Sequence, residues 1–324
     1  MQDIYQNKLR SDEFRKDKSL EETLAEINKA IKDVSIEHET YPQLPIVLIV
    51  GNARSGSTLV LQYLASTSSF SYPSNLISRF YANPWMGIKI QQVLHDLVAQ
   101  KDLTFDSKLG RTEGLLSPSE YWYFWRQFYK FGQINKLSEK ELATVNYEKY
   151  LKGLGAFDAL LKKPLVMKGL IMNWNLDFLH KIYPKFIFLH LSRNILENAK
   201  SLFQARRKFF NNEENWYSFK PPEYESLKTK SPIEQVVGQV YFTNKAINDQ
   251  LDKIPKKNKI GITYEDFCNC PVDLYKMINS KMKEFGVDLT PTSIDSSLTF
   301  KSKSVATFSQ KEENLFKEAL KHYD

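Results

Sequence analysis

The stretch GNARSGST at residues 51–58 follows the apolar run LPIVLIV at residues 44–50. It matches the phosphate-loop spacing G-x-x-x-x-G-K-[ST] except at Ser57, which stands where the lysine is expected. The glycines still let successive N–H groups point at one anion, and a following helix adds the positive end of its dipole. Arg54 can place two donors on phosphate or sulfate oxygens. The stretch therefore predicts an anion site. The alternative is a glycine turn that only joins a strand to a helix.

Short apolar runs indicate a parallel sheet. Residues 46–50, IVLIV, lack polar alternation, which is typical of a strand buried on both faces. Residues 164–168, PLVMK, and 186–191, FIFLHL, predict two further inner strands, and residues 259–263, KIGIT, a weaker fourth. Apolar residues at helical spacing follow the first and third of these runs, so a helix is expected after each. We predict an α/β fold, a doubly wound parallel β-sheet of the phosphate-loop type flanked by helices.

The chain divides into an N-terminal helical extension at residues 1–40 and a single domain at 41–324. Apolar positions repeat along residues 19–34, and Ser19 with Glu22 reads as a capping box for a helix docked on its own domain. The stripe is short for a coiled coil, and a homodimer is left open. Residues 80–160 form a helical, aromatic-rich insertion, which we expect to fold over the carboxyl ends of the strands on the acceptor side.

Composition narrows the functional classes. The 324 residues carry a formal net charge of +7, which favours an anionic ligand, but the charges form no tract, so we expect no nucleic-acid partner. The two cysteines, Cys268 and Cys270, fit neither an ordinary disulfide nor a zinc pattern, and the simplest interpretation is a reducing cytoplasm. No apolar run approaches the roughly 20 residues of a membrane span, and we expect no signal peptide.

A second cation follows the strand at residues 186–191. A nucleotide triphosphatase would place an acidic residue near that strand end to reach magnesium, whereas this chain has Ser192-Arg193. Ser201 lies about two turns along the next helix, and Arg206 and Arg207 follow it. The sequence thus predicts two anion sites at two strand ends and no metal site.

These motifs resemble those of one family. GNARSGST resembles the 5′-phosphosulfate loop of sulfotransferases that use 3′-phosphoadenosine 5′-phosphosulfate (PAPS), in the arginine-bearing form of carbohydrate and tyrosyl-protein enzymes and many bacterial relatives. Arg193 with Ser201 is similar to the family's 3′-phosphate site. Residues 262–267, ITYEDF, resemble its segment near the adenine. The resemblance implies PAPS as co-substrate without a metal, and these donor-binding residues: Arg54, Ser55, Gly56, Ser57, Thr58, Arg193, Ser201, Tyr264, Ser302 and Lys303.

The resemblance also implies a base and a cation for sulfuryl transfer. Lys168, at the end of the PLVMK run, is similar to a lysine of some family members near the bridging oxygen, and Arg54 is expected to stabilise the leaving group. The family's usual base positions hold no base here, so we assign the role to Glu120, with Glu113 and His95 as alternatives. The other interpretation of Glu120 is a capping box with Ser117.

The acceptor is the substrate that the sequence defines least. The arginine-loop branch favours a carbohydrate or glycolipid hydroxyl, and a sterol or another small alcohol is left open. Two rival functions are a divergent phosphate-loop kinase or triphosphatase and a nucleotide-binding module without catalysis.

Overall fold

The computed structural model describes residues 8–37, 39–94, 104–289, 294–302 and 308–323. Within these ranges a parallel sheet has the strand order β2-β1-β3-β4. The strands are β1 (Ile46–Gly51), β2 (Leu165–Lys168), β3 (Phe186–Ser192) and β4 (Lys259–Thr263). They form where the four apolar runs predict them, which confirms the α/β prediction.

The strand register brings the carboxyl ends to one edge of the sheet. Lys168 is paired with Ile49 of β1, while Gly51 is paired with Leu191 of β3. Ser192 is in turn paired with the last residue of β4, Thr263. Because all four strands run in parallel, the segments that follow them emerge side by side. The glycine loop, Lys168 and the residues after β3 and β4 therefore share this edge.

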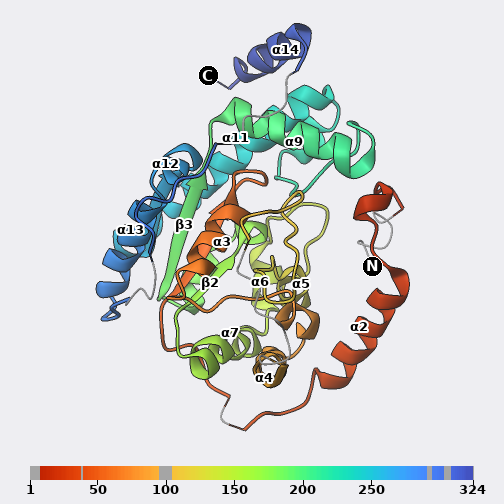
Figure 1. Ribbon diagram of the computed structural model, residues 1–324. Coiled ribbons are helices and arrows are strands. Elements are labelled where there is room, and N and C mark those ends of the chain that lie inside the picture. The colour runs from red at the N-terminus through yellow and green to blue at the C-terminus, as the bar shows by residue number, and fades with distance from the viewer. Residues whose placement is uncertain (1–7, 38, 95–103, 290–293, 303–307, 324) are drawn as a thin grey trace.

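Alternate side chains of β1 enter two separate cores. Ile46, Leu48 and Val50 pack into one cluster, and Val47 with Ile49 into the other. This is the two-sided burial that a continuous apolar strand requires. Helices cover both faces (Figure 1). One face carries α3 (Ser57–Ser66), α12 (Tyr264–Asn269) and α13 (Pro271–Lys283), and the other carries α5 (Trp122–Phe128), α7 (Tyr147–Leu161), α8 (Leu176–Ile182) and α11 (Pro232–Leu251).

The aromatic insertion forms part of the cluster that contains Ile46, Leu48 and Val50. The rings of Phe124, Trp125 and Tyr150 lie within 5.6 to 6.3 Å of one another, between centroids, and all three are buried. They join α5 to α7 and to the sheet. Aromatic residues at this density supply much of the apolar area that holds α5 and α7 against this face of the sheet.

The N-terminal helix begins one residue earlier than predicted, with a different cap. α2 (Lys18–Ile31) has Asp17 as its N-cap, because the Asp17 carboxylate accepts a hydrogen bond from Leu20 N at 3.0 Å. The Ser19–Glu22 capping box is therefore wrong. The side chain of Asn28 docks the helix by donating to the carbonyl of Arg79 at 2.8 Å and accepting from Ala82 N at 2.9 Å.

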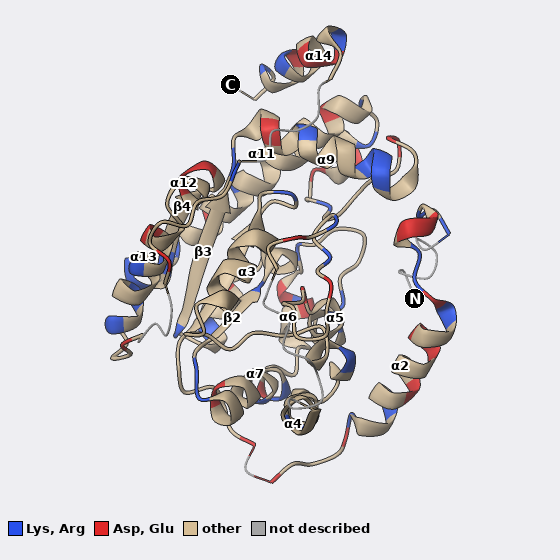
Figure 2. Ribbon diagram, in the orientation of Figure 1, with Lys and Arg blue, Asp and Glu red and all other residues tan. Residues whose placement is uncertain are grey.

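The remaining elements surround this framework. They are the helices α4 (Pro84–Leu94), α6 (Glu139–Ala143), α9 (Ile195–Phe210), α10 (Tyr224–Leu227) and α14 (Gln310–Leu320) and the short 3-10 helices η1 (Asp12–Phe14), η2 (Ile77–Phe80), η3 (Leu170–Met172) and η4 (Lys256–Asn258). Lys and Arg are spread over many of these elements (Figure 2). Among the described helices, none combines the length and apolar character needed to cross a bilayer.

Candidate active site

The glycine loop joins β1 directly to α3. Gly56 is the N-cap of α3 with φ of 97°, and a Cβ at this position would lie 2.3 Å from the Tyr264 ring. Only glycine meets both conditions. The loop is also fixed from behind, since the Asn173 side chain exchanges two hydrogen bonds with the backbone of Gly51, at 3.3 and 2.8 Å. The first N–H groups of α3 are thus held at the edge of the sheet, where an anion meets the positive end of the helix dipole.

Two polar atoms of this loop are buried without a hydrogen-bond partner among the described residues. They are Nε of Arg54 and Oγ of Ser55, and Ser55 is 0% exposed. Buried polar groups are nearly always paired in folded proteins. A bound anion supplies acceptors for both donors, so the loop fits a phosphate or phosphosulfate group.

Arg193 connects the end of β3 to this loop. Its guanidinium donates to the carbonyl of Arg54 at 3.1 Å and lies 4.7 Å from the centroid of the Tyr264 ring. Its Nε lies 4.0 Å from Oε1 of Glu265, and its side chain is only 7% exposed. Tyr264 in turn packs on Gly56. The loop, Arg193 and Tyr264 therefore form one rigid cluster, although they come from three separate segments.

The helix after β3 does not supply the two extra arginines that the sequence suggested. Arg206 is 0% exposed and donates to Oε1 of Gln235 at 2.7 Å, and burial lowers its pKa to about 10. Arg207 instead pairs with Glu213 and Glu312. On an α-helix these positions lie about 140° and 240° around the axis from Ser201. Ser201 is half-buried in α9.

A lysine and a carboxylate meet beside the loop. Nζ of Lys168 lies 3.0 Å from Oγ1 of Thr58 and forms an ion pair with Oε1 of Glu120. The Trp122 indole donates to the other oxygen of Glu120. Lys168 is 5% exposed and Glu120 27%. The cation is thus shared between the anion loop and the carboxylate, an arrangement suited to proton transfer next to a developing negative charge.

Glu120 precedes its helix and does not cap it. Helix α5 begins at Trp122, and Tyr121 before it has φ of 56°. The Ser117 hydroxyl donates to the carbonyl of Glu113, so the capping box of Ser117 with Glu120 is wrong. The left-handed turn at Tyr121 directs Glu120 toward Lys168. Glu113, the alternative base, is exposed to solvent.

A tight turn at residues 108–111 also reaches this site, and sequence reasoning missed it. The backbones of Lys108 and Arg111 exchange two hydrogen bonds, each 2.9 Å, and Gly110 between them has φ of 90°. A Cβ on Gly110 would lie 3.2 Å from Oε1 of Glu120, 3.4 Å from Oγ1 of Thr58 and 4.0 Å from Nη1 of Arg54. The backbone of this turn therefore lines one side of the site.

The N-terminal segment holds that turn in place. Nη2 of Arg111 donates to the carbonyl of Phe14 at 3.0 Å, and Lys108 pairs with Glu13 at 3.3 Å. The Tyr217 hydroxyl donates to the carbonyl of Leu109 in this turn at 3.5 Å. Burial raises the pKa of that hydroxyl, and the charges of Arg54 and Glu120 both act on it. Part of the region predicted as an N-terminal extension thus contacts the edge of the candidate site.

The other candidates have separate positions. His95 and Lys303 lie outside the described residues. Ser302 is exposed, two residues after Phe300, whose ring stacks on Phe267 at 5.6 Å. His190 of β3 is a packed histidine whose pKa is lowered to about 4 by burial. Across the described ranges, no three His, Cys, Asp or Glu side chains are grouped as metal ligands.

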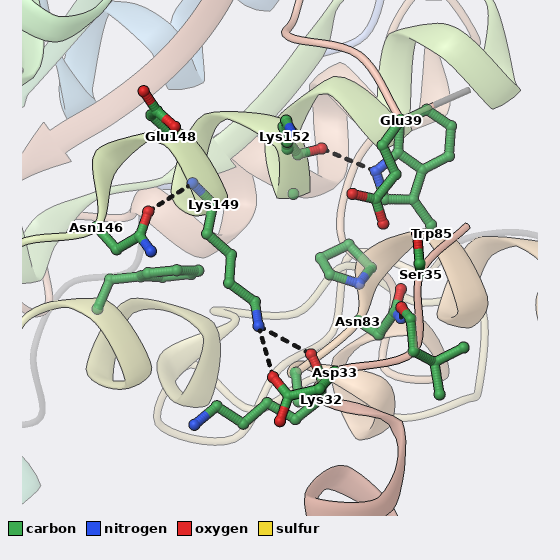
Figure 3. A pocket seen from close by; sticks show the side chains of 15 residues that line it. Lys32, Asp33, Ser35, Glu39, Asn83, Trp85, Asn146, Glu148, Lys149 and Lys152 are labelled. Carbon is green, nitrogen blue, oxygen red and sulfur yellow. Dashed lines mark hydrogen bonds and ion pairs between the residues drawn. The ribbon is translucent and has the colours of Figure 1, made fainter. Parts of the chain in front are cut away.

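A larger hollow lies elsewhere, between the end of α2, α4 and α7 (Figure 3). The ammonium of Lys149 is engaged locally, since it donates to the carbonyl of Lys32 at 2.9 Å and to the carboxylate of Asp33 at 3.3 Å. Trp85 donates its indole N–H to the carbonyl of Lys152 at 2.9 Å. None of the predicted site residues lines this hollow, so the candidate active site is the sheet edge.

Fold and site together define the class. The protein has a phosphate-loop-like α/β fold whose glycine loop carries Arg54 and lacks the usual lysine, with a second arginine, Arg193, directly after the neighbouring strand. The model of the Sulfotransferase family matches residues 45–291, and the chain belongs to that family. It is therefore a sulfotransferase.

The solved structure of one sulfotransferase supports the fold. The chain is similar to sulfotransferase STF9 from Mycobacterium avium, with 12% identity, a TM-score of 0.52, and coverage of 94% of this chain and 84% of that one. A sulfotransferase from Alicyclobacillus acidocaldarius shares 16% identity over 86% of this chain and 93% of that one, with a TM-score of 0.41. No curated protein matches the chain in sequence.

Proposed function

We propose that this sulfotransferase moves the sulfuryl group of PAPS to an acceptor hydroxyl, with Glu120 as the base and Lys168 as the cation. The observation that carries the proposal is the shared position of Lys168, whose ammonium contacts both Thr58 of the anion loop and Glu120. A cation placed there acts on the donor's bridging oxygen and on the base together.

The donor would bind across the carboxyl ends of β1, β3 and β4. Arg54, Ser55 and the first N–H groups of α3 would hold the 5′-phosphosulfate, and Arg193 with Ser201 the 3′-phosphate. Tyr264 would lie near the adenine. The unpartnered donors on Arg54 and Ser55 support this assignment.

The reaction then needs one proton transfer and one substitution at sulfur. Glu120 accepts the proton of the acceptor hydroxyl while the acceptor oxygen forms a bond to sulfur. The bond between sulfur and the bridging oxygen breaks, and 3′,5′-adenosine bisphosphate (PAP) leaves with that oxygen. Lys168 and Arg54 stabilise the negative charge that builds on it. Protonation of Glu120 removes its charge, which releases Lys168 toward the leaving oxygen.

A kinase or triphosphatase is the main alternative. Such an enzyme needs an acidic residue at the end of β3 to reach magnesium, whereas this chain has Ser192 and Arg193 there. Calorimetry separates the two. We expect PAP to bind with or without magnesium and ATP to bind weakly. Preferential binding of ATP with magnesium would refute the proposal.

The variant Glu120→Gln tests the base. We expect turnover to fall by about 100-fold or more, the usual contribution of a general base, with PAP affinity unchanged. Glu113→Gln is the matched control, because Glu113 is exposed and belongs to the same segment. Retention of turnover in Glu120→Gln would remove Glu120 as the base. Binding of PAP without any sulfate transfer, whatever the acceptor, would favour a nucleotide-binding module.

A further inference from the structure

Residues 10–16, here called the strap, lie beside the turn at residues 108–111 and outside residues 45–291, which the family model matches. The strap contains η1, which lies beside the end of α9 (Figure 1). Ser11 fixes it there, because its N–H donates to the carbonyl of Phe209 at 2.8 Å and its hydroxyl to the carbonyl of Lys208 at 2.9 Å. The role of the strap therefore follows from its own contacts.

Phe14 is the buried anchor of the strap. It is 3% exposed, and its ring lies 5.1 Å from the ring of Phe209, between centroids. The Arg111 guanidinium lies 5.2 Å from the centroid of Phe14 and 5.9 Å from that of Phe209. Arg111 also donates to the carbonyl of Phe14 at 3.0 Å. Because two rings and a carbonyl hold this guanidinium, Phe14 fixes one end of the turn.

The ion pair between the strap and the turn contributes less. Nζ of Lys108 lies 3.3 Å from Oε1 of Glu13, but the two side chains are 68% and 58% exposed. Solvent screens such exposed pairs, so they stabilise a fold only slightly. The contacts of Arg111 with Phe14 therefore supply most of the attachment.

The turn transmits this constraint to Glu120. The backbones of Lys108 and Arg111 exchange two hydrogen bonds of 2.9 Å, so the two ends of the turn move together. Gly110 between them lies so close to Glu120 that a Cβ on it would be 3.2 Å from Oε1. The hollow that Glu120 lines with Leu170 has room for about one water molecule. Little empty space is therefore available there to absorb a shift of the turn.

The N-terminal region also reaches α5, which supplies another contact of Glu120. Nζ of Lys16 in the strap lies 4.4 Å from the centroid of the Tyr123 ring, and the Tyr123 hydroxyl donates to Glu21 of α2. Tyr123 directly follows Trp122, whose indole donates to Glu120. The turn before Glu120 and the start of α5 after it are thus both attached to the N-terminal region.

We infer that Phe14 and Arg111 are positioning residues for the base and act on it through the turn at residues 108–111. The strap is thus a part of the active site that acts on Glu120 and not on the donor. The inference rests on the proposed function, because it takes Glu120 as the base. Loss of the anchor should slow proton removal, while donor binding by the glycine loop and Arg193 stays unchanged.

Hydrogen exchange tests the attachment without catalysis. The amides of Lys108 and Arg111 are hydrogen-bonded across the turn. We expect exchange at positions 108 and 111 to become about tenfold faster or more in Phe14→Ala and in Arg111→Ala. Arg15→Ala is the matched control, because Arg15 directly follows Phe14, is exposed and pairs with Asp12 of the strap. It should exchange as the parent protein does. Unchanged exchange in both test variants would overturn the inference.

Release of sulfate from PAPS tests the effect on the base, with water as the acceptor. We expect kcat to fall about tenfold or more in Phe14→Ala and Arg111→Ala, with PAP affinity by calorimetry unchanged. Phe14→Leu keeps an apolar side chain against Phe209, so its kcat should lie between those of Phe14→Ala and the parent protein. Arg15→Ala should keep the parent kcat. Equal kcat in all variants, or a loss of PAP affinity that parallels the loss of kcat, would overturn the inference.

The two measurements separate this inference from the proposed function. Faster exchange in the test variants of a parent protein that releases no sulfate would support the attachment and contradict the proposed reaction. Slower release without faster exchange would overturn the route through the turn. Faster release in the test variants would also overturn the inference, because it would show that the strap restricts access to Glu120. Urea unfolding establishes that each variant is folded at the assay temperature.

Discussion

Replacing Gly110 with alanine tests whether the turn at residues 108–111 positions the base. Gly110 has φ of 90°, a conformation that costs an alanine about 1–2 kcal/mol. The new Cβ would also lie 3.2 Å from Oε1 of Glu120, closer than an ordinary contact, but 4.0 Å from Nη1 of Arg54, an ordinary distance. Since Lys168 and Trp122 hold the carboxylate, its displacement by a few tenths of an ångström would disturb the position from which the proposed base accepts the proton.

We therefore expect Gly110→Ala to lower the free energy of unfolding by about 1–2 kcal/mol and kcat by about tenfold, with PAP affinity unchanged. Gly286→Ala is the matched control, because Gly286 has φ of 76° and nothing within 4 Å of its added Cβ. It should lose similar stability and keep full activity. The measurements are urea unfolding, calorimetry with PAP and steady-state kinetics. Equal kcat in the two variants would refute the role given to the turn, and a selective loss of PAP affinity in Gly110→Ala would show that the turn acts on the donor instead.

Three further predictions use residues around the sheet. Arg193→Ala should weaken PAP binding by about 1.5–3 kcal/mol, the value of a charge-assisted hydrogen bond, and calorimetry with 5′-AMP should show a smaller loss because that ligand lacks the 3′-phosphate. Arg206→Ala should cost about 2–4 kcal/mol in urea unfolding, because it leaves Oε1 of Gln235 without its donor and creates a void, yet it should not change PAP affinity. His190 has a folded-state pKa of about 4, below the ordinary 6.5, so stability is complete above pH 6.5 and falls as the pH drops toward 4. Between pH 7 and pH 5 the parent protein should lose about 2 kcal/mol more than His190→Gln, and equal losses would contradict the buried neutral histidine.

The sheet could be predicted because its strands are buried on both faces. Such strands are short apolar runs with no polar alternation, and the runs at residues 46–50 and 186–191 leave little choice of structure. The fourth strand, β4, contains Gly261 and is only partly buried, and its signal was correspondingly weaker. The cap of α2 was misplaced because Asp17 and Ser19 are both good N-cap residues. Only the path of the chain into the helix decides between them.

The candidate site was predictable only where its residues lie in local motifs. The glycine loop and Arg193 each follow a recognisable strand, so their common edge follows from parallel topology. The contact of Gly110 with Glu120 and Thr58 depends on how the insertion folds, and no local pattern encodes it. Arg206 follows Ser201 closely in the sequence, but it lies about 140° around the axis of α9 from Ser201 and is buried.

The neighbouring strand β2 offers a physical explanation for Ser57, which stands where the loop lysine is expected. Lys168 of β2 is paired in register with Ile49, and its ammonium reaches Thr58, the residue after Ser57. A cation is thus present at the loop, but it comes from β2 and also contacts the carboxylate of Glu120. A lysine within the loop would be committed to the phosphates, whereas in the proposed function Lys168 would be shared between the donor and the base. In the proposed reaction this sharing links proton removal from the acceptor to stabilisation of the leaving group, because protonation of Glu120 leaves the charge of Lys168 available to the bridging oxygen.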